Sequence, residues 1–307
     1  MNAIRKPITT FKLRKMKQEG EPITIVTAYD YPSAMLAEEA GVDCILVGDS
    51  MGNVVLGYDS TIPVTLDDMI HHSKAVNRGV SSAFVITDMP FMTYHGSIDR
   101  TLENVGRVMR ETGSKAVKME GGREIADTVK AVVKAGVPVM GHVGLTPQSV
   151  HQIGGYRVQG KTAEDAERLV EDVKALEEAG CFAVVLELMT AETAERITRE
   201  VSIPTIGIGA GPGCDGQVLV FHDMLEYGSS SAPKRFVKTF ARVGDEIRSG
   251  IAKYVQEVKS RSFPLPEHSF SGDTSVKGAN KGSDDGKTKQ GEPGNQSEDI
   301  AVYGSGK

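Results

Sequence analysis

Short apolar runs recur between residues 24 and 221 of the chain, and amphipathic stretches separate most of them. The runs are nearly continuous in apolar side chains and often β-branched, a pattern typical of parallel strands that are buried on both faces. We therefore predict strands at residues 24–28, 44–47, 83–87, 116–119, 137–141, 182–186, 205–208 and 217–221.

Helical patterns fill most of the intervals between these runs. Residues 34–40 read as a helix that stops at Gly41, and residues 163–179 as a longer helix that stops at Gly180. Strands that alternate with helices in one continuous body predict an α/β protein, a single-domain (β/α)₈ TIM barrel. Two connections are irregular: a long one at residues 145–161 and a short one after the seventh strand.

The composition changes sharply near residue 270. Residues 271–307 are rich in glycine and charged side chains and hold almost no apolar ones. Such a segment cannot bury enough surface to offset the entropy of ordering, so we predict a disordered low-complexity tail. The catalytic barrel domain is then expected at residues 1–270, close to the roughly 250 residues of a typical barrel.

Charge and cysteine content narrow the class of protein. The 307 residues include 35 basic and 41 acidic side chains, for a net charge of −6, which argues against nucleic acid as the partner. No apolar run approaches the roughly 18 residues that span a bilayer, so we expect no membrane partner. The three cysteines, Cys44, Cys181 and Cys214, are too scattered for a disulfide framework. We expect a reducing compartment, the cytoplasm.

Polar side chains stand at the carboxyl ends of consecutive predicted strands. In a barrel these ends converge on one face, where the active site lies. A single Asp or Ser in such a place can be only a helix N-cap, but so many carboxylates together predict a site. The residues in question are Asp30, Asp49, Ser50, Asp88, Lys118, Glu120, His142 and Glu187.

The carboxylates in this set predict a metal ion. Clustered carboxylates repel one another unless a cation or protons neutralise them, and hard oxygen ligands without cysteine favour Mg²⁺. We expect Asp49 and Asp88 as direct ligands, with Glu120 binding directly or through water. The ion would act as a Lewis acid on a 2-oxo acid and stabilise its enolate. Lys118 shares a strand face with Glu120, and it pairs either with the substrate carboxylate or with a neighbouring acid.

Glu187 and His142 each leave two interpretations. Glu187 follows an apolar run, so burial should raise its pKa and suit it to act as a general base; the alternative is a buried ion pair. His142 is either a hydrogen-bond donor to substrate or a structural histidine. The glycine-rich stretch 207–213 either lets the backbone approach a ligand or forms a tight turn. Its G-x-G-x-x-G pattern at 211–216 precedes a strand, so a dinucleotide site is not expected.

Over roughly residues 8–270 the chain resembles the ketopantoate hydroxymethyltransferase family. The resemblance rests on long stretches: TAYDY at 27–31, VGDSMG at 47–52, TDMPFM at 87–92, VKMEGG at 117–122, GHVGLTPQS at 141–149, IGIGAG at 206–211, DGQ at 215–217 and EHSF at 267–270. After Glu187 the family usually has Cys-Val-Pro, whereas this chain has Leu188, Met189 and Thr190.

The resemblance implies a Mg²⁺-dependent transfer of a hydroxymethyl group from 5,10-methylenetetrahydrofolate to 3-methyl-2-oxobutanoate. The product would be 2-dehydropantoate, on the route to pantothenate and coenzyme A. It also implies a (β/α)₈ barrel in a homo-oligomer, commonly a decamer. Carried over by position, Asp49, Asp88 and Glu120 would be the metal site and Glu187 the catalytic proton acceptor. The residues that would hold the oxo acid are Asp49, Ser50, Asp88 and Lys118.

Two competing functions remain. One is another Mg²⁺-enolate barrel, a lyase or mutase of the isocitrate lyase and phosphoenolpyruvate mutase type, which typically uses a reactive cysteine or a set of phosphate-binding residues on a mobile loop. Cys44 stands at the start of its predicted strand and Cys181 precedes the predicted strand at 182–186, so neither follows a strand end, which disfavours this function. The other is a barrel that only binds or scaffolds, which would be expected to lack one or more of the carboxylates.

Overall fold

Eight parallel strands close into a barrel in chain order, as the sequence predicts. The structure is a computed structural model, and it describes residues 5–228 and 234–270. The predicted strands are all confirmed, with shifts at some ends; β2 and β7 have the predicted bounds. The strands are β1 (Ile23–Thr27), β2 (Cys44–Val47), β3 (Phe84–Asp88), β4 (Ala116–Glu120), β5 (Val139–Gly144), β6 (Ala183–Glu187), β7 (Thr205–Ile208) and β8 (Gly216–Leu219).

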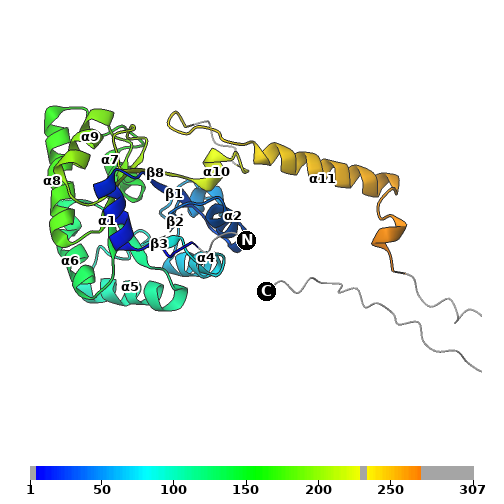
Figure 1. Cartoon of the computed structure of the whole chain (residues 1–307), viewed down its shortest axis with the longest axis horizontal. Helices are drawn as coiled ribbons and strands as arrows, with labels where there is room; N and C mark the ends of the chain where they lie inside the picture. The colour runs from blue at the N-terminus through cyan, green and yellow to red at the C-terminus, as the bar shows by residue number, and fades with distance from the viewer. Residues whose placement is uncertain (1–4, 229–233, 271–307) are drawn as a thin grey trace, which may run out of the picture. The chain divides into compact units, whose positions relative to one another are not determined.

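Helices surround the barrel, with α5, α6, α8 and α9 along its outer side (Figure 1). The longer helices are α1 (Thr10–Glu19), α2 (Tyr31–Glu39), α4 (Leu66–Arg78), α5 (Ile98–Thr112), α6 (Ala126–Lys134), α8 (Ala163–Ala179), α9 (Ala191–Glu200) and α11 (Val243–Ser260). The short ones are α3 (Met51–Val54), α7 (Val150–Ile153), α10 (Phe221–Met224) and the 3₁₀ turns η1 (Arg123–Ile125), η2 (Pro147–Ser149) and η3 (Pro266–His268).

The chain divides into two compact units between Ile251 and Ala252, within α11. The predicted tail at 271–307 lies outside the described residues, so the domain assignment stays a prediction. Within the described ranges, no helix combines the length and the apolar character that crossing a bilayer requires.

Helix ends follow local capping chemistry. Helix α8 has the predicted bounds because the Thr162 hydroxyl accepts from the Asp165 N–H at its start, and Gly180 adopts a left-handed φ of 101° at its end. Asp30 is likewise a cap: its carboxylate accepts a hydrogen bond from the Ser33 N–H at 2.8 Å at the start of α2. Asp30 therefore belongs to a helix end and is exposed, whereas Ser50 precedes α3 without capping it through its side chain.

The core has an inner and an outer part. The inner core fills the barrel with alternate strand residues, and α1 adds Leu13 and Met16 to it, which are 2% and 1% exposed. The outer core lies between the strands and the helices, where Val117, Val184 and Leu176 are fully buried. Because the inner core ends below the last residue of each strand, the polar side chains that follow face a cavity rather than a packed interior.

The glycine-rich stretch forms a short turn between β7 and β8. Gly209 and Gly211 have φ values of 63° and 78°, which glycine adopts without strain. Asp215 closes the turn by accepting from the Thr205 N–H at 2.8 Å and from the Lys17 ammonium at 2.8 Å. The strand that follows confirms that this is not a dinucleotide-binding motif.

Glu38 connects α2 to the segment that enters β3. Its carboxylate accepts from the N–H groups of Ser81, Ser82 and Ala83 at 2.9, 2.6 and 2.8 Å. Burial alone would raise its pKa, but these backbone donors outweigh burial and lower it to about 2. The carboxylate therefore stabilises the entry into β3 in its charged form.

Replacing Glu38 by glutamine is expected to lower the free energy of unfolding near neutral pH by roughly 1 kcal/mol, a modest value because the group is partly solvent-screened. A pKa that is lower in the folded protein adds stability above the unfolded value, ordinarily 4.5, and that stability fades as the pH falls toward about 2. Urea unfolding of both proteins at neutral and acid pH measures this. Glu39→Gln, at the exposed neighbour, is the control. If the difference in unfolding free energy between wild type and Glu38→Gln does not shrink in acid, the charged carboxylate of Glu38 does not provide this stability.

Candidate active site

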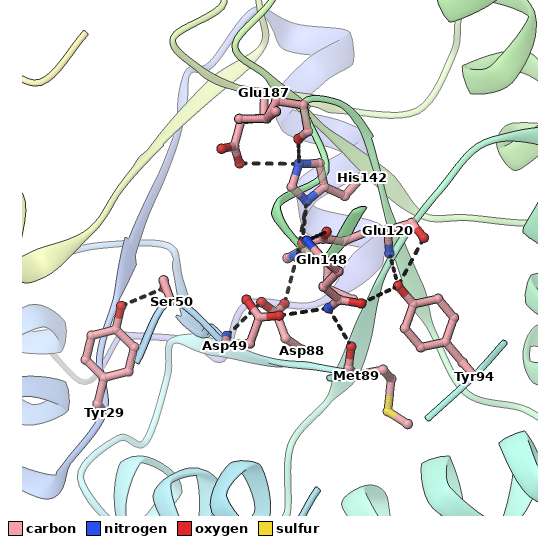
Figure 2. Close-up of polar contacts among 12 residues, drawn as sticks. Tyr29, Asp49, Ser50, Asp88, Met89, Tyr94, Glu120, His142, Gln148 and Glu187 are labelled. Carbon is pink, nitrogen blue, oxygen red and sulfur yellow. Dashed lines mark hydrogen bonds and ion pairs between the residues drawn. The ribbon is translucent and has the colours of Figure 1, made fainter. Parts of the chain in front are cut away.

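Strand register brings the predicted site residues side by side. Asp88 on β3 is the partner of Lys118 on β4, and Glu120 on β4 is the partner of His142 on β5. Glu187 ends β6 opposite Gly144. Lys118 and Glu120 also share a strand face because side chains alternate with a period of two. Parallel pairing therefore assembles the cluster from separate strands, as Figure 2 shows.

The acids of the cluster are buried around the Lys118 ammonium. Asp49, Asp88 and Glu120 are 3%, 2% and 4% exposed. Lys118 Nζ lies 3.1 Å from Asp88 Oδ1 and 3.4 Å from Glu120 Oε1. Asp88 Oδ2 accepts from the Asp49 N–H at 3.1 Å. Here Lys118 therefore pairs with neighbouring acids, one of the two interpretations that the sequence allowed.

Charge is unevenly compensated within the cluster. Burial raises the pKa of Asp49 well above its ordinary value, and repulsion from Glu120 and Asp88 adds to the rise. Burial also raises the pKa of Asp88, although Lys118 opposes it. Burial would raise the pKa of Glu120 too, but Lys118 and His142 outweigh it and lower that pKa to about 2. One ammonium and one imidazole thus leave Asp49 and Asp88 short of positive charge.

The residues present suit a hard divalent cation. Asp88 Oδ1 is buried and accepts no hydrogen bond in the described part of the chain, although the Lys118 ammonium is close. The donors that face this space are carboxylate oxygens, the ligands that Mg²⁺ prefers. The predicted ligands do come together, but not as a preformed set: among the described side chains, no three acids, histidines or cysteines are placed to hold an ion. Lys118 lies between Asp88 and Glu120 and contacts both of them.

Glu187 stands apart from the acid cluster, at the far side of His142. His142 Nε2 lies 3.3 Å from Glu187 Oε2, while His142 Nδ1 lies 3.3 Å from Glu120 Oε1. Burial and Lys118 lower the pKa of His142, but Glu120 and Glu187 outweigh them and raise it to about 9. The Glu187 side chain is 18% exposed, so it is less deeply buried than its sequence neighbours suggested. Strand alternation directs Glu187 to the cavity and Leu186 to the outer core.

These groups line one cavity of about 350 Å³ at the carboxyl ends of the strands. Ser50 faces it, and its hydroxyl lies 2.8 Å from the hydroxyl of the buried Tyr29. Apolar side chains form the rest of the wall, among them Leu145, Val185, Ile208 and Val218. A larger hollow of about 1120 Å³ runs past Lys17 and Gln217 and holds none of the clustered acids.

Sequence reasoning missed Gln148 and Tyr94, which are 3% and 0% exposed beside the acids. Gln148 lies in the long connection after β5, and Tyr94 in the connection after β3. Neither is at a strand end, so the pattern that found the other residues does not apply to them. For Gln148 the available signals were the unusual length of the connection at 145–161 and the family-like stretch GHVGLTPQS at 141–149.

Gly144 sets the position of Glu187. Gly144 has a φ of 99°, and a Cβ added there would lie 2.2 Å from the carbonyl oxygen of Glu187. That oxygen accepts from the Leu145 N–H at 2.8 Å. The two strand ends can approach this closely only because residue 144 has no side chain.

We expect Gly144→Ala to lower turnover about 10²-fold, because it displaces Glu187, and to cost roughly 1–3 kcal/mol of stability. Gly136→Ala is the matched control: its φ is 92°, but an added Cβ would meet nothing within 4 Å. Thermal unfolding and steady-state turnover of both variants measure the difference. Equal effects at the two positions would show that backbone strain alone is responsible.

Charged side chains gathered at the carboxyl ends of barrel strands define a (β/α)₈-barrel enzyme, since that face carries the active site throughout the class. Within this class, the chain belongs to the ketopantoate hydroxymethyltransferase family, whose model matches residues 7–266. The resemblance seen in the sequence is confirmed.

Relatives with a curated name agree. The chain is 58% identical over 256 residues to a 3-methyl-2-oxobutanoate hydroxymethyltransferase of Bacillus cereus (strain B4264), with 83% of this chain and 92% of the relative covered. A protein of the same name from Bacillus thuringiensis (strain Al Hakam) is also 58% identical over 256 residues, covering 83% of this chain and 91% of the relative. The chain is therefore an enzyme that transfers a hydroxymethyl group, and the scaffold hypothesis is set aside.

Solved structures share the fold. A phosphonopyruvate hydrolase in complex with oxalate and Mg²⁺ aligns with a TM-score of 0.55 and 15% identity, covering 86% of this chain and 92% of the other. A 2,3-dimethylmalate lyase, a member of the PEP mutase/isocitrate lyase superfamily, aligns with a TM-score of 0.54 and 18% identity, covering 85% and 94%. At these identities the likeness concerns the barrel, and family membership decides against the lyase or mutase alternative.

Proposed function

We propose that this enzyme moves a one-carbon unit from 5,10-methylenetetrahydrofolate to 3-methyl-2-oxobutanoate with Mg²⁺, and so forms 2-dehydropantoate for pantothenate synthesis. The observation that carries the proposal is the separation of two kinds of carboxylate in one cavity. Asp49, Asp88 and Glu120 form a buried cluster, while Glu187 is held apart by His142. A carboxylate that binds no cation keeps its basicity, which proton abstraction from carbon requires.

The acid cluster and its neighbours supply the means to bind the oxo acid. Asp49 and Asp88 would hold the ion, with Glu120 ligating directly or through water. A bound Mg²⁺ would polarise the keto group and make the adjacent C–H more acidic. The Lys118 ammonium and the Ser50 hydroxyl are donors that can hold the substrate carboxylate. Asp49 and Asp88, being anionic, would hold the substrate through the ion rather than by direct contact.

The cavity fits the apolar part of the substrate. Its volume of about 350 Å³ is at the small end of the range for ligand sites. Val185, Ile208 and Val218 give the branched alkyl group an apolar wall, which removes water from around the reacting carbon. This wall suits a branched aliphatic oxo acid better than a charged one.

Glu187 would take the proton from C3 of the oxo acid. The C3–H bond breaks, and its electron pair forms the new bond to the one-carbon unit of the folate. Water supplies the hydroxyl oxygen, both carbon–nitrogen bonds of that unit break, and the proton from C3 and one from water end on the two folate nitrogens. His142 holds the Glu187 carboxylate through Nε2, which also lies 2.9 Å from the carbonyl oxygen of Leu145. Because a carbonyl oxygen can only accept a hydrogen bond, Nε2 carries a proton. This proton faces the Leu145 carbonyl oxygen and the Glu187 carboxylate.

Deuterium exchange tests the first half of this reaction without the folate. The full-length protein is incubated with the oxo acid and Mg²⁺ in D₂O, and uptake at C3 is followed by NMR. We expect uptake that requires both protein and Mg²⁺. The complete reaction is then measured as 2-dehydropantoate formed after methylenetetrahydrofolate is added, and no product under these conditions would refute the proposal. A homo-oligomer, a decamer, and a cytoplasmic location complete the proposal and stay predictions.

A further inference from the structure

The side chain of Gln148 lies at the centre of the polar contacts behind the acid cluster (Figure 2). It is 3% exposed and sits on η2, after β5. Its Nε2 donates to Asp49 Oδ2 at 2.8 Å and to the carbonyl oxygen of Met89 at 3.0 Å. Its backbone N–H donates to Glu120 Oε2 at 3.1 Å. One residue thus contacts two of the proposed metal ligands and the residue that follows the third, Asp88.

Tyr94 fixes the orientation of the Gln148 amide. The Tyr94 hydroxyl lies 2.9 Å from Gln148 Oε1 and 3.0 Å from the carbonyl oxygen of Glu120, and it accepts from the Glu120 N–H at 3.0 Å. Both groups near Gln148 Nε2 are acceptors, whereas the group near Oε1 is a hydroxyl. Only one orientation of the amide satisfies all of these partners, so the network defines which end faces Asp49.

Gln148 donates hydrogen bonds to these acids without adding the positive charge that a cationic side chain would bring. Asp49 and Glu120 repel each other across a buried space, and an unpaired buried carboxylate is costly. Gln148 engages one oxygen of each acid with a neutral donor and leaves Asp49 Oδ1 without a hydrogen bond in the described part of the chain. A neutral donor adds no positive charge that would compete with a cation. Glu120 Oε1, by contrast, faces Lys118 Nζ at 3.4 Å and His142 Nδ1 at 3.3 Å.

We propose that Gln148, oriented by Tyr94, is a positioning residue that fixes the side chains of Asp49 and Glu120 relative to each other and thereby favours binding of a divalent cation. The inference rests on the proposed Mg²⁺-dependent function. Gln148 does not touch substrate in this role. Partners that orient metal ligands typically contribute 10–100-fold to metal affinity, so the effect should be seen in binding rather than only in turnover.

The test measures Mg²⁺ binding to the full-length protein by calorimetry. Gln148→Met keeps the length of the side chain and the backbone donor but removes the amide, and we expect it to raise the Mg²⁺ Kd about 10–100-fold. Tyr94→Phe removes one oxygen and should raise Kd less. Because the two residues act through one contact, the double variant should show less than the sum of the single effects. If Gln148→Met does not fold, the Mg²⁺ Kd of Tyr94→Phe is the deciding measurement.

Ser73→Ala is the control for a general loss of stability. Ser73 is fully buried on α4, and its hydroxyl bonds to the Thr87 hydroxyl at 2.8 Å rather than to any of the acids, so its variant should bind Mg²⁺ with the wild-type Kd. If Gln148→Met and Tyr94→Phe bind like wild type, or only as weakly as Ser73→Ala, the inference is wrong while the proposed function stands. Wild-type protein that binds no Mg²⁺ would instead overturn the metal dependence itself, and this inference with it.

Discussion

Replacing Glu187 by glutamine is expected to slow C3 deuterium exchange and product formation together, by roughly 10²–10⁴-fold, the usual contribution of a general base. The two rates fall in parallel because both begin with the same proton abstraction. Glutamine keeps the size of the side chain and an oxygen that can accept from His142 Nε2, which lies 3.3 Å from the carboxylate. The Mg²⁺ Kd should therefore stay near the wild-type value.

Glu192→Gln is the matched control, since Glu192 is an exposed residue on α9 and contributes nothing to the cavity lining. It should exchange and turn over like wild type. If Glu187→Gln exchanges C3 hydrogen at the wild-type rate, Glu187 is not the base, and water or another side chain takes the proton. If Glu187→Gln loses Mg²⁺ affinity together with exchange and turnover, Glu187 belongs to the metal site rather than acting as a separate base.

Removing the charge of Asp88 is expected to abolish metal binding and, with it, most of the activity. Asp88→Asn keeps the shape but leaves the buried cluster with one negative charge fewer, so the Mg²⁺ Kd should rise by more than the roughly 100-fold that orienting residues contribute. EDTA should likewise stop turnover in the wild-type protein, and added Mg²⁺ should restore it. Calorimetry measures the affinity, and product formation measures the recovery.

Asp43→Asn is the control that separates the loss of Mg²⁺ binding in Asp88→Asn from the general effect of replacing a buried acid. Asp43 is 8% exposed and precedes β2, at the opposite end of the barrel, where it bonds to Thr24. We expect the variant to lose stability but to bind Mg²⁺ normally. Full turnover in protein freed of metal by EDTA would contradict the metal dependence, because the acids would then need no cation to act.

The element pattern could be predicted because it depends on local properties. A parallel strand is buried on both faces, so β2 appears as a continuous apolar run and β7 as a nearly continuous one. Helix α8 ends where it was predicted to end, because Gly180 adopts the left-handed conformation there. The polar residues of the site could be predicted for a related reason. They follow these runs directly, and the carboxyl ends of barrel strands meet at one face.

Contacts in the folded chain decided environments that the sequence misjudged or left open. Glu187 follows an apolar run, yet strand alternation and His142 leave it partly exposed. Asp30 follows a strand like the others, yet the Ser33 N–H makes it a helix cap. Lys118 could pair with substrate or with acids, and the register that sets it opposite Asp88 decides for the acids in this structure.

The sequence by itself therefore determined the barrel, the set of charged residues at its mouth and, through the family resemblance, the enzyme class, since these depend on periodicity and on motifs within single segments. The tertiary structure alone decided which charged groups touch and what holds them. Gln148 reaches Asp49 across 99 positions of sequence, and Tyr94 reaches the Glu120 backbone across 26. Contacts of that kind depend on the path of a connection over the closed barrel, which no local pattern encodes.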